Sequence, residues 1–285
     1  MMSAVLSNPG HPEYGVATIP FPIPRDQYAY CMKLLEALES GDAVKADCKV
    51  EKIDSFYTVR KRMEMLPVNV EELNYLAKRL DSFDTGEAAQ FQAMAHKLEL
   101  FELKDLINLT FCCQQATVIT DFSDLAAVGR DHYMNLHGGS ASVDELNKLD
   151  GEGTARQLIE SGSGTITPYG VVYDNGMKLE QVYDGRFFPC YYYEPNVITV
   201  AVTSKAEPED TEHITWLFLP MVQEEIDRAL LRGGITDPSE IRLSLEDSWL
   251  PHEVLDRLDM DHVDISELNA LVQALDEFSD MSIRK

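Results

Sequence analysis

One stretch of fifteen residues occurs twice in this chain. NVEELNYLAKRLDSF at residues 69–83 aligns without a gap with DISELNALVQALDEF at residues 264–278, and seven of the fifteen positions are identical. Each copy begins with a capping box, which starts at Asn69 in the first and at Asp264 in the second, and each continues with apolar residues at the spacing of one helical face. The repeat therefore predicts the same amphipathic helix in two places.

The residues that precede each copy also correspond. Residues 3–83 read as strand, loop, strand ending in proline, helix, strand and capped helix, and the same order returns from residue 196 onward. IPFPIP corresponds to LFLPM, and CKVEKIDS corresponds to IRLSLEDS. The predicted fold class is α+β, with two copies of a small antiparallel-sheet-plus-helix module flanking a mostly helical middle in an elongated multi-domain chain.

The predicted boundaries divide the chain into four parts. Residues 1–68 form an N-terminal α+β module, and residues 69–136 form the helical middle. Residues 137–165 are rich in glycine, serine and acids, and are predicted to be a linker with one short helix. Residues 166–285 hold a β-rich segment, in which DNG and YDG are hairpin signals, and then the second, more acidic module.

Charge is the unusual property of this sequence. There are 49 acids against 24 bases, a net charge of −25, and the imbalance deepens from 15 acids and 11 bases in residues 1–100 to 20 and 7 in residues 201–285. Direct binding to nucleic acid is not expected, because phosphate contacts need clusters of Lys and Arg. An anionic membrane surface is disfavoured for the same reason. The start has no signal-peptide pattern and no apolar run is long enough to span a bilayer, so a cytoplasmic location is expected.

The two copies of the helix differ on their polar face. Lys78 and Arg79 of the first copy correspond to Gln273 and Ala274 of the second. The net charge of the stretch goes from −1 (three acids, two bases) to −4 (four acids, no base). Any single carboxylate here is ordinarily a solvated surface group. Together, carboxylates held on a folded surface can occupy a groove built for duplex DNA, which carries one negative charge per roughly 1.7 Å of axis.

The acidic surface of the second module is therefore the candidate partner-binding site. It imitates DNA in this interpretation, and its carboxylates stand in for phosphates. The candidate residues are Glu207, Glu209, Asp210, Glu224, Glu225, Asp227, Asp237, Glu240, Glu246, Asp247, Asp256, Asp259, Asp261, Asp264, Asp276 and Glu277.

A catalytic, cofactor or metal site is not expected. The seven histidines show no metal-ligand spacing, and the five cysteines form no C-x-x-C pair. The glycines at 162–170 do not form a phosphate-binding loop, and no G-x-S-x-G elbow is present. Cys112 and Cys113 follow an apolar run, as buried packing residues do. The chain is thus predicted not to be an enzyme.

Several motifs resemble the ArdA antirestriction family. VEELNYLAKRLDSF, followed by LKDLINLTFCCQQATVITDFSDLAAVGRDHY, is similar to the family's Leu-Asn-Leu-Ala-type helix, its DLINLT-like helix start and its Leu-Gly-Arg-Tyr-like helix. The resemblance covers about 3–135 and returns in about 196–280. The matching residues are Leu73, Asn74, Leu76 and Ala77, then Asp105 to Thr110, and then Val128, Gly129 and Arg130.

The resemblance implies a function. ArdA proteins are acidic mimics of bent B-form DNA that occupy the DNA groove of Type I restriction-modification enzymes; they are carried by mobile elements, are not enzymes and form elongated dimers. The implied partner is a DNA-binding protein complex of this kind. The residues themselves leave open a DNA-mimic inhibitor of another host-defence complex and an acidic adaptor for a basic protein. They also leave open a homodimer, or a second module that replaces the dimer partner within one chain.

Overall fold

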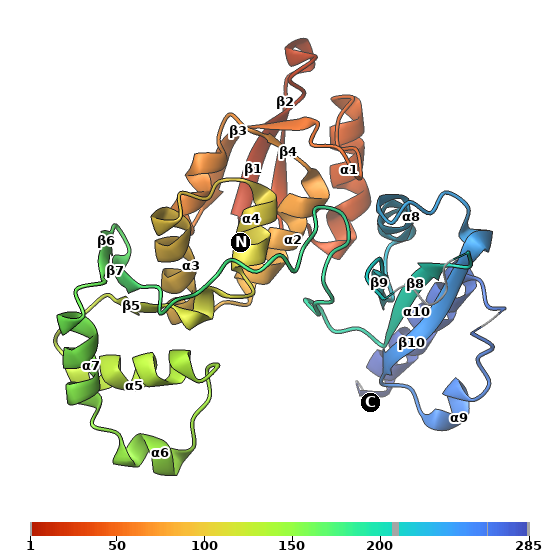
Figure 1. The fold of residues 1–285 in the computed structure, drawn as a ribbon. Coiled ribbons are helices and arrows are strands. Elements are labelled where there is room, and N and C mark those ends of the chain that lie inside the picture. The colour runs from red at the N-terminus through yellow and green to blue at the C-terminus, as the bar shows by residue number, and fades with distance from the viewer. Residues whose placement is uncertain (1, 207–210, 261, 284–285) are drawn as a thin grey trace.

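The structure is a computed structural model that describes residues 2–206, 211–260 and 262–283, without the side chains of residues 278–283. It is α+β with three small antiparallel sheets, which confirms the predicted fold class. Figure 1 shows three bodies: the first module with its adjoining helices in the centre, a helical lobe at one end and the second module at the other. Within the described residues, no helix is long and apolar enough to cross a membrane.

The first module is a sheet of strand order β2-β1-β3-β4 with helices packed on it. Alternating apolar residues on β1 and β2 face inward, as the period of two in a strand requires. Its elements are β1 (Met2–Ser7), β2 (Val16–Phe21), α1 (Tyr28–Ala37), β3 (Cys48–Ser55), β4 (Pro67–Val68) and α2 (Val70–Asp81).

The second module repeats this arrangement. Its sheet has the order β10-β8-β9, so β8, β9 and β10 take the places of β1, β2 and β3. The corresponding pairings, β1 with β3 and β8 with β10, each have one register shift. The helices α8 and α10 take the places of α1 and α2. The elements are β8 (Ile198–Ser204), β9 (Thr215–Leu219), α8 (Gln223–Arg232), β10 (Ile241–Ser248), α9 (His252–Leu255) and α10 (Ile265–Ile283).

Asn74 and Asn269 are identical in the two copies of the repeat, and they make the same buried hydrogen bond. The side-chain oxygen of Asn74 on α2 accepts a hydrogen bond from the backbone N–H of Ile23 at 2.8 Å. The side-chain oxygen of Asn269 on α10 accepts one from the N–H of Met221, also at 2.8 Å. Both donors directly follow a proline whose peptide bond is cis. The asparagine is buried in each copy, where it satisfies a backbone donor just beyond the second strand.

The middle of the chain divides between two bodies. Helices α3 (Thr85–Lys97) and α4 (Leu103–Leu109) share one hydrophobic core with the first module, and this core runs from the sheet through α2 to α4. Helices α5 (Leu125–Leu136), α6 (Val143–Lys148) and α7 (Gly151–Glu160) form the helical lobe. A three-stranded sheet of order β5-β7-β6 connects the two bodies, with β5 at Thr117–Ile119, β6 at Thr165–Thr167 and β7 at Gly170–Tyr173.

The region predicted as a linker carries two helices, α6 and α7, rather than one short helix. Helix α7 packs against α5 through glycine on both sides. A Cβ atom at Gly129 would lie 1.8 Å from the carbonyl oxygen of Gly151, so neither backbone could approach as closely with a side chain present. The Gly-rich composition that suggested a linker is thus partly a helix-packing feature.

The signals DNG and YDG predicted hairpins that the structure does not have. Residues 174–177 do form a tight turn, in which the N–H of Met177 donates to the carbonyl of Asp174 at 2.8 Å, but the described residues directly after it form no strand. The hairpin of this region turns at Pro168 and Tyr169, between β6 and β7. Residues 174–197, here called the strap, contain no helix or strand and run across the first core toward the second module. The strap is fixed by buried Tyr183, whose N–H donates to Asn108 at 2.7 Å and whose carbonyl accepts from the same side chain at 3.0 Å. Tertiary contacts of this kind, and not strand pairing, hold the strap in place.

Short 3-10 helices connect several elements of the fold. They lie at Pro12–Tyr14 (η1), Arg25–Gln27 (η2), Thr58–Met63 (η3), Cys113–Gln115 (η4) and Pro238–Glu240 (η5).

We expect Asn269→Ala to lower the free energy of unfolding of the second module by about 1–3 kcal/mol, because the N–H of Met221 would lose its acceptor in the protein interior. Denaturant unfolding followed by tryptophan fluorescence measures this, since Trp216 and Trp249 both lie in the second module. Gln273→Ala, on the exposed side of the same helix, is the control and should change the value by less than about 0.5 kcal/mol. Equal stability of the two variants would contradict this role for Asn269.

Candidate functional site

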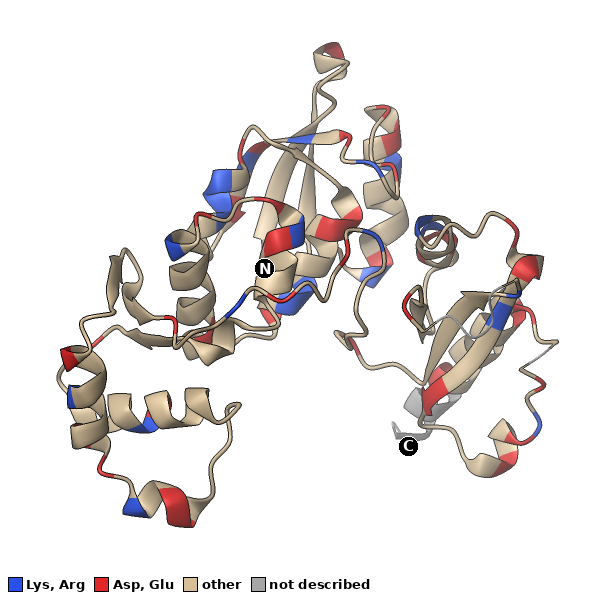
Figure 2. Ribbon diagram, viewed as in Figure 1, with Lys and Arg blue, Asp and Glu red and all other residues tan. Residues whose placement is uncertain are grey.

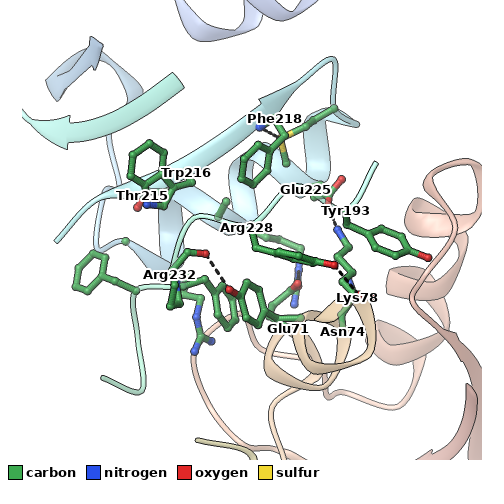
Figure 3. A pocket seen from close by; sticks show the side chains of 18 of the residues that line it. Glu71, Asn74, Lys78, Tyr193, Thr215, Trp216, Phe218, Glu225, Arg228 and Arg232 are labelled. Carbon is green, nitrogen blue, oxygen red and sulfur yellow. Dashed lines mark hydrogen bonds and ion pairs between the residues drawn. The ribbon is translucent and has the colours of Figure 1, made fainter. Parts of the chain in front are cut away.

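The two modules meet where α8 of the second packs against α2 of the first (Figure 3). The contact is made of opposite charges. The Nε of Arg228 donates to the Glu71 carboxylate at 2.5 Å, and Arg232 donates to Glu72 at 3.3 Å. Arg228 and Arg232 are four residues apart, so one face of α8 presents both guanidinium groups to α2. Two bases of the acidic module are thus directed toward carboxylates of the other module.

Arg232 is the centre of this contact and is only 3% exposed. Its guanidinium also lies 4.4 Å from the centroid of the Phe188 ring. All three nitrogens donate, and they reach carbonyl, amide, hydroxyl and carboxylate oxygens from three parts of the chain. The acceptors are Ala43 in the loop between α1 and β3, Asn69 and Glu72 at the start of α2, and Tyr183, Gly185 and Arg186 of the strap. A guanidinium group can make this set of bonds because its N–H donors form a fixed planar fork.

A second layer of paired charges surrounds Arg228. The hydroxyl of Tyr28 donates to Glu71 at 2.9 Å, and Lys78 on α2 pairs with Glu225 on α8 at 3.3 Å. Burial is the largest single influence and acts to lower the pKa of Arg228, but Glu71 and Tyr28 together outweigh it and hold that pKa above its ordinary value. Burial also raises the pKa of the Tyr28 hydroxyl well above its usual range. Arg228 is therefore a cation and Tyr28 a neutral donor at physiological pH.

The outer surface of the second module is strongly acidic as a result. Among the described residues from 197 to 277, thirteen carboxylate side chains are exposed and three basic side chains are exposed. The exposed bases are Lys205, Arg242 and Arg257. The other two described bases of this stretch, Arg228 and Arg232, lie in the contact with the first module. Figure 2 shows the consequence, with acidic positions along the outer edge of the second module.

The structure divides the candidate acidic residues into three groups. Glu207, Glu209, Asp210 and Asp261 lie outside the described residues. Glu224 and Glu225 are partly buried, and Glu225 is engaged with Lys78, so it belongs to the contact between modules. The remaining candidates are exposed: Asp227, Asp237, Glu240, Glu246, Asp247, Asp256, Asp259, Asp264, Asp276 and Glu277.

The exposed candidates occupy several elements rather than one row. Asp237 is the N-cap of η5 and Glu240 is its last residue, directly before β10, whereas Glu246 and Asp247 lie near the other end of that strand. A strand rises about 3.3 Å per residue, so the two pairs are on the order of 20 Å apart. The others follow α9 or lie on α8 and α10. The carboxylates therefore cover the module's exterior over a distance comparable to half a turn of duplex DNA.

Several of these carboxylates also have local structural roles. Asp264 is the N-cap of α10, where its side chain accepts from Ser266 N–H at 2.8 Å and Glu267 N–H at 3.3 Å. Asp237 accepts from the N–H of Ser239 at 2.9 Å. Hydrogen bonds from the backbone and the side chain of Ser239 hold the pKa of Asp237 below its ordinary value. A capping carboxylate keeps its charge at the surface and has a fixed position, so both roles are compatible.

A cavity of about 140 Å³ lies between the modules, beside the α2–α8 contact (Figure 3). Aromatic side chains line much of it, including Tyr75, Trp216 and Phe218. Several of its charged groups are paired, as in the Lys78–Glu225 pair and in the Arg25–Glu194 pair at 3.1 Å.

The described residues contain no cluster of His, Cys, Asp and Glu that could hold a metal ion. Four cysteines are buried and one, Cys190, is exposed. Burial raises the pKa of the Cys113 thiol, and burial together with the neighbouring Asp47 carboxylate raises that of Cys48 to about 12. These thiols are packing groups and not nucleophiles.

Sequence reasoning did not identify the residues that join the modules. Glu71, Arg228 and Arg232 were not among the candidates, although one signal was available. The first helix copy carries Glu71 where the second carries Ser266, a difference opposite to the general increase in acidity. The structure shows that Glu71 is needed where α2 meets an arginine of α8.

We expect Arg232→Gln to destabilise the second module by about 3–5 kcal/mol, because it would leave the Glu72 carboxylate in a largely buried site without its cation. Denaturant unfolding monitored by tryptophan fluorescence measures the loss. Arg257→Gln removes the same charge from an exposed arginine of the same module and should change stability by less than about 0.5 kcal/mol. A similar stability for both variants would show that the buried contact is not important.

No protein-family model matches this chain, and no curated protein matches it. The ArdA resemblance therefore rests on the quoted motifs alone, and function has to be inferred from charge and geometry.

Proposed function

We propose that this protein is an antirestriction protein that mimics B-form DNA and competitively occupies the DNA-binding groove of a Type I restriction-modification enzyme. One observation carries the proposal: the second module directs Arg228 and Arg232 inward, against the first module, while thirteen carboxylates remain exposed on its exterior. The motifs that resemble the ArdA family point to the same activity.

The electrostatic reasoning is direct. A groove that binds DNA presents Lys and Arg side chains to two rows of phosphates. A protein surface with many carboxylates and few cations experiences the same attraction and the same acceleration of association. Inward pairing of the arginines strengthens this surface, because cations on the exterior would cancel part of its field. The proposal needs no catalytic residue, cofactor or metal.

Rigidity supports imitation of a duplex rather than loose attraction. Most of the exposed carboxylates lie on or next to β10, α8, α9 and α10. The elements β10, α8 and α10 pack on one hydrophobic core, and Leu250 and Leu258 on either side of α9 pack against it. Fixed groups lose little conformational entropy when they bind, whereas the residues of a disordered acidic tail would have to be ordered first. Because the chain holds two modules, one chain could take the place of two subunits along a groove. The proposal is also compatible with a homodimer. The protein would act in the cytoplasm, where Type I restriction-modification enzymes meet DNA.

We expect the protein to displace a labelled duplex from a Type I methyltransferase core near one-to-one stoichiometry, and to do so less well as salt rises from about 50 to 200 mM, since ionic attraction is screened. Fluorescence anisotropy of the duplex measures this displacement. If the folded protein displaces no DNA at low salt, the proposal of a Type I target is wrong. Binding to the enzyme without displacement of DNA would instead indicate an acidic adaptor.

The location of the charge can be tested with two variants of equal net charge. One neutralises five exposed carboxylates of the second module, and we expect it to need at least about tenfold more protein for half-displacement, since each exposed pair contributes about 0.2–1 kcal/mol. The other neutralises five exposed carboxylates elsewhere and should displace DNA almost as well as the wild type. The first set is Glu240, Glu246, Asp256, Asp276 and Glu277, and the second is Asp26, Glu36, Asp54, Glu99 and Glu102, each changed to its amide. Equal losses would mean that only total charge matters.

A further inference from the structure

The indole of Trp249 is the most exposed aromatic side chain that the described structure records, at 83% exposure. It lies directly after β10, on the acidic side of the second module. A single exposed apolar residue needs no explanation. Trp249 differs because its backbone is held firmly and because its setting is repeated elsewhere in the chain.

Two hydrogen bonds fix the backbone on either side of this ring. The N–H of Trp249 donates to the carbonyl of Val197 at 2.9 Å, which continues the pairing of β10 with β8 by one residue. The N–H of Leu250 donates to the hydroxyl of Ser248 at 3.0 Å. Leu250 then packs against the core of the second module. The ring is therefore presented to solvent from an ordered turn, so little entropy is lost when a partner covers it.

The first module has the same turn. The N–H of Tyr57 donates to the hydroxyl of Ser55 at 3.1 Å, and Phe56 between them is 73% exposed. Ser55 and Ser248 are the last residues of the corresponding strands β3 and β10. Both modules thus use a serine at the strand end to turn the next residue, an aromatic one, outward.

The charges near the two rings differ. Near Phe56 in the sequence both signs are exposed, with Lys52 and Lys61 as bases and Asp54 as an acid, and Arg60 is buried. Trp249 is preceded by Glu246 and Asp247 and followed by Glu253 and Asp256, all four of them exposed, and Arg257 is the exposed base of this stretch. An aromatic face bordered by carboxylates favours a cationic partner, whereas the surroundings of Phe56 do not.

We propose that Trp249 is the anchor residue with which the acidic surface binds an arginine-bearing protein surface. A guanidinium group of the partner stacks on the indole, and carboxylates of Glu246, Asp247 or Asp256 accept its N–H groups. The inference rests on the proposed function, in which that surface is the groove of a DNA-binding enzyme. Arginine fits better than lysine, because its planar, weakly hydrated cation can stack and donate at the same time.

Hexa-arginine and hexa-lysine peptides test the preference for arginine. With full-length protein at low salt, we expect hexa-arginine to bind more tightly, and Trp249→Ala to weaken it about two- to fivefold, the range of an exposed cation–π contact. Hexa-lysine should bind this variant much as it binds wild type. Trp249→Phe should retain part of the preference, and Phe56→Ala should retain all of it. Isothermal titration measures the affinities, and circular dichroism checks folding, which loss of an exposed ring should not alter.

Tryptophan fluorescence gives an independent readout. Hexa-arginine should change the emission of the wild type, and this change should be absent in Trp249→Ala, where Trp216 is the remaining tryptophan. Equal hexa-arginine affinity of wild type and Trp249→Ala would overturn the proposal. So would an absence of hexa-arginine binding to the wild type.

Displacement of DNA separates this proposal from the one on which it rests. If Trp249→Ala displaces the duplex from the methyltransferase core severalfold less well than the wild type, the anchor role is supported. If both displace it equally, Trp249 is not the anchor and the DNA-mimic function stands. If the wild type does not displace DNA but the arginine preference depends on Trp249, the anchor stands and the partner is another basic protein.

Discussion

The arrangement of this molecule depends on a buried arginine. Arg232 brings its guanidinium out of water at the α2–α8 contact, at a cost that only a full set of acceptors can offset. It finds them on α2 and its N-cap Asn69, on the loop between α1 and β3, and on the strap, so three parts of the chain converge on one side chain. The same contact has an electrostatic effect. Each arginine that pairs inward is a cation removed from the exterior, so the interaction that orients the second module also makes its outer surface acidic.

The two copies of the scaffold diverged according to what covers them. In the first copy, α2 is packed against the sheet, α4 and α8, and Leu76 is fully buried. In the second copy, α10 buries Ile265, Leu268 and Val272 against its own sheet, but Leu271, the counterpart of Leu76, is 41% exposed. The polar faces of the two helices differ for the same reason. Helix α2 pairs with α8 through carboxylates and a lysine. Helix α10 has no such neighbour among the described residues, and its acids face solvent.

A distributed acidic surface and a defined anchor are complementary in recognition. Long-range attraction from many carboxylates accelerates encounter and tolerates small errors of position, but it discriminates weakly among basic partners. A rigid aromatic residue such as Trp249 contributes short-range contact that depends on orientation, as interface hot spots commonly do. The second module offers both on one exterior, whereas the first offers an exposed ring, Phe56, with charges of both signs beside it in the sequence. The functional difference between the copies therefore lies in charge and not in backbone.

The sequence by itself determined the local elements and the repeat: the capped helices at residues 69–83 and 264–278, the strands before them and the α+β class, because periodicity and caps are encoded within a few neighbouring residues. It misjudged the strap, where DNG and YDG look like hairpins, and the helix α7, whose glycines serve packing. The sequence also could not show toward which part of the protein a charged side chain points. The spacing of Arg228 and Arg232 shows that they share a face of α8, and Glu225 looks like any other surface acid. Only the tertiary structure decided that these three face the first module, since the partner of a helix face lies more than a hundred residues away in the chain.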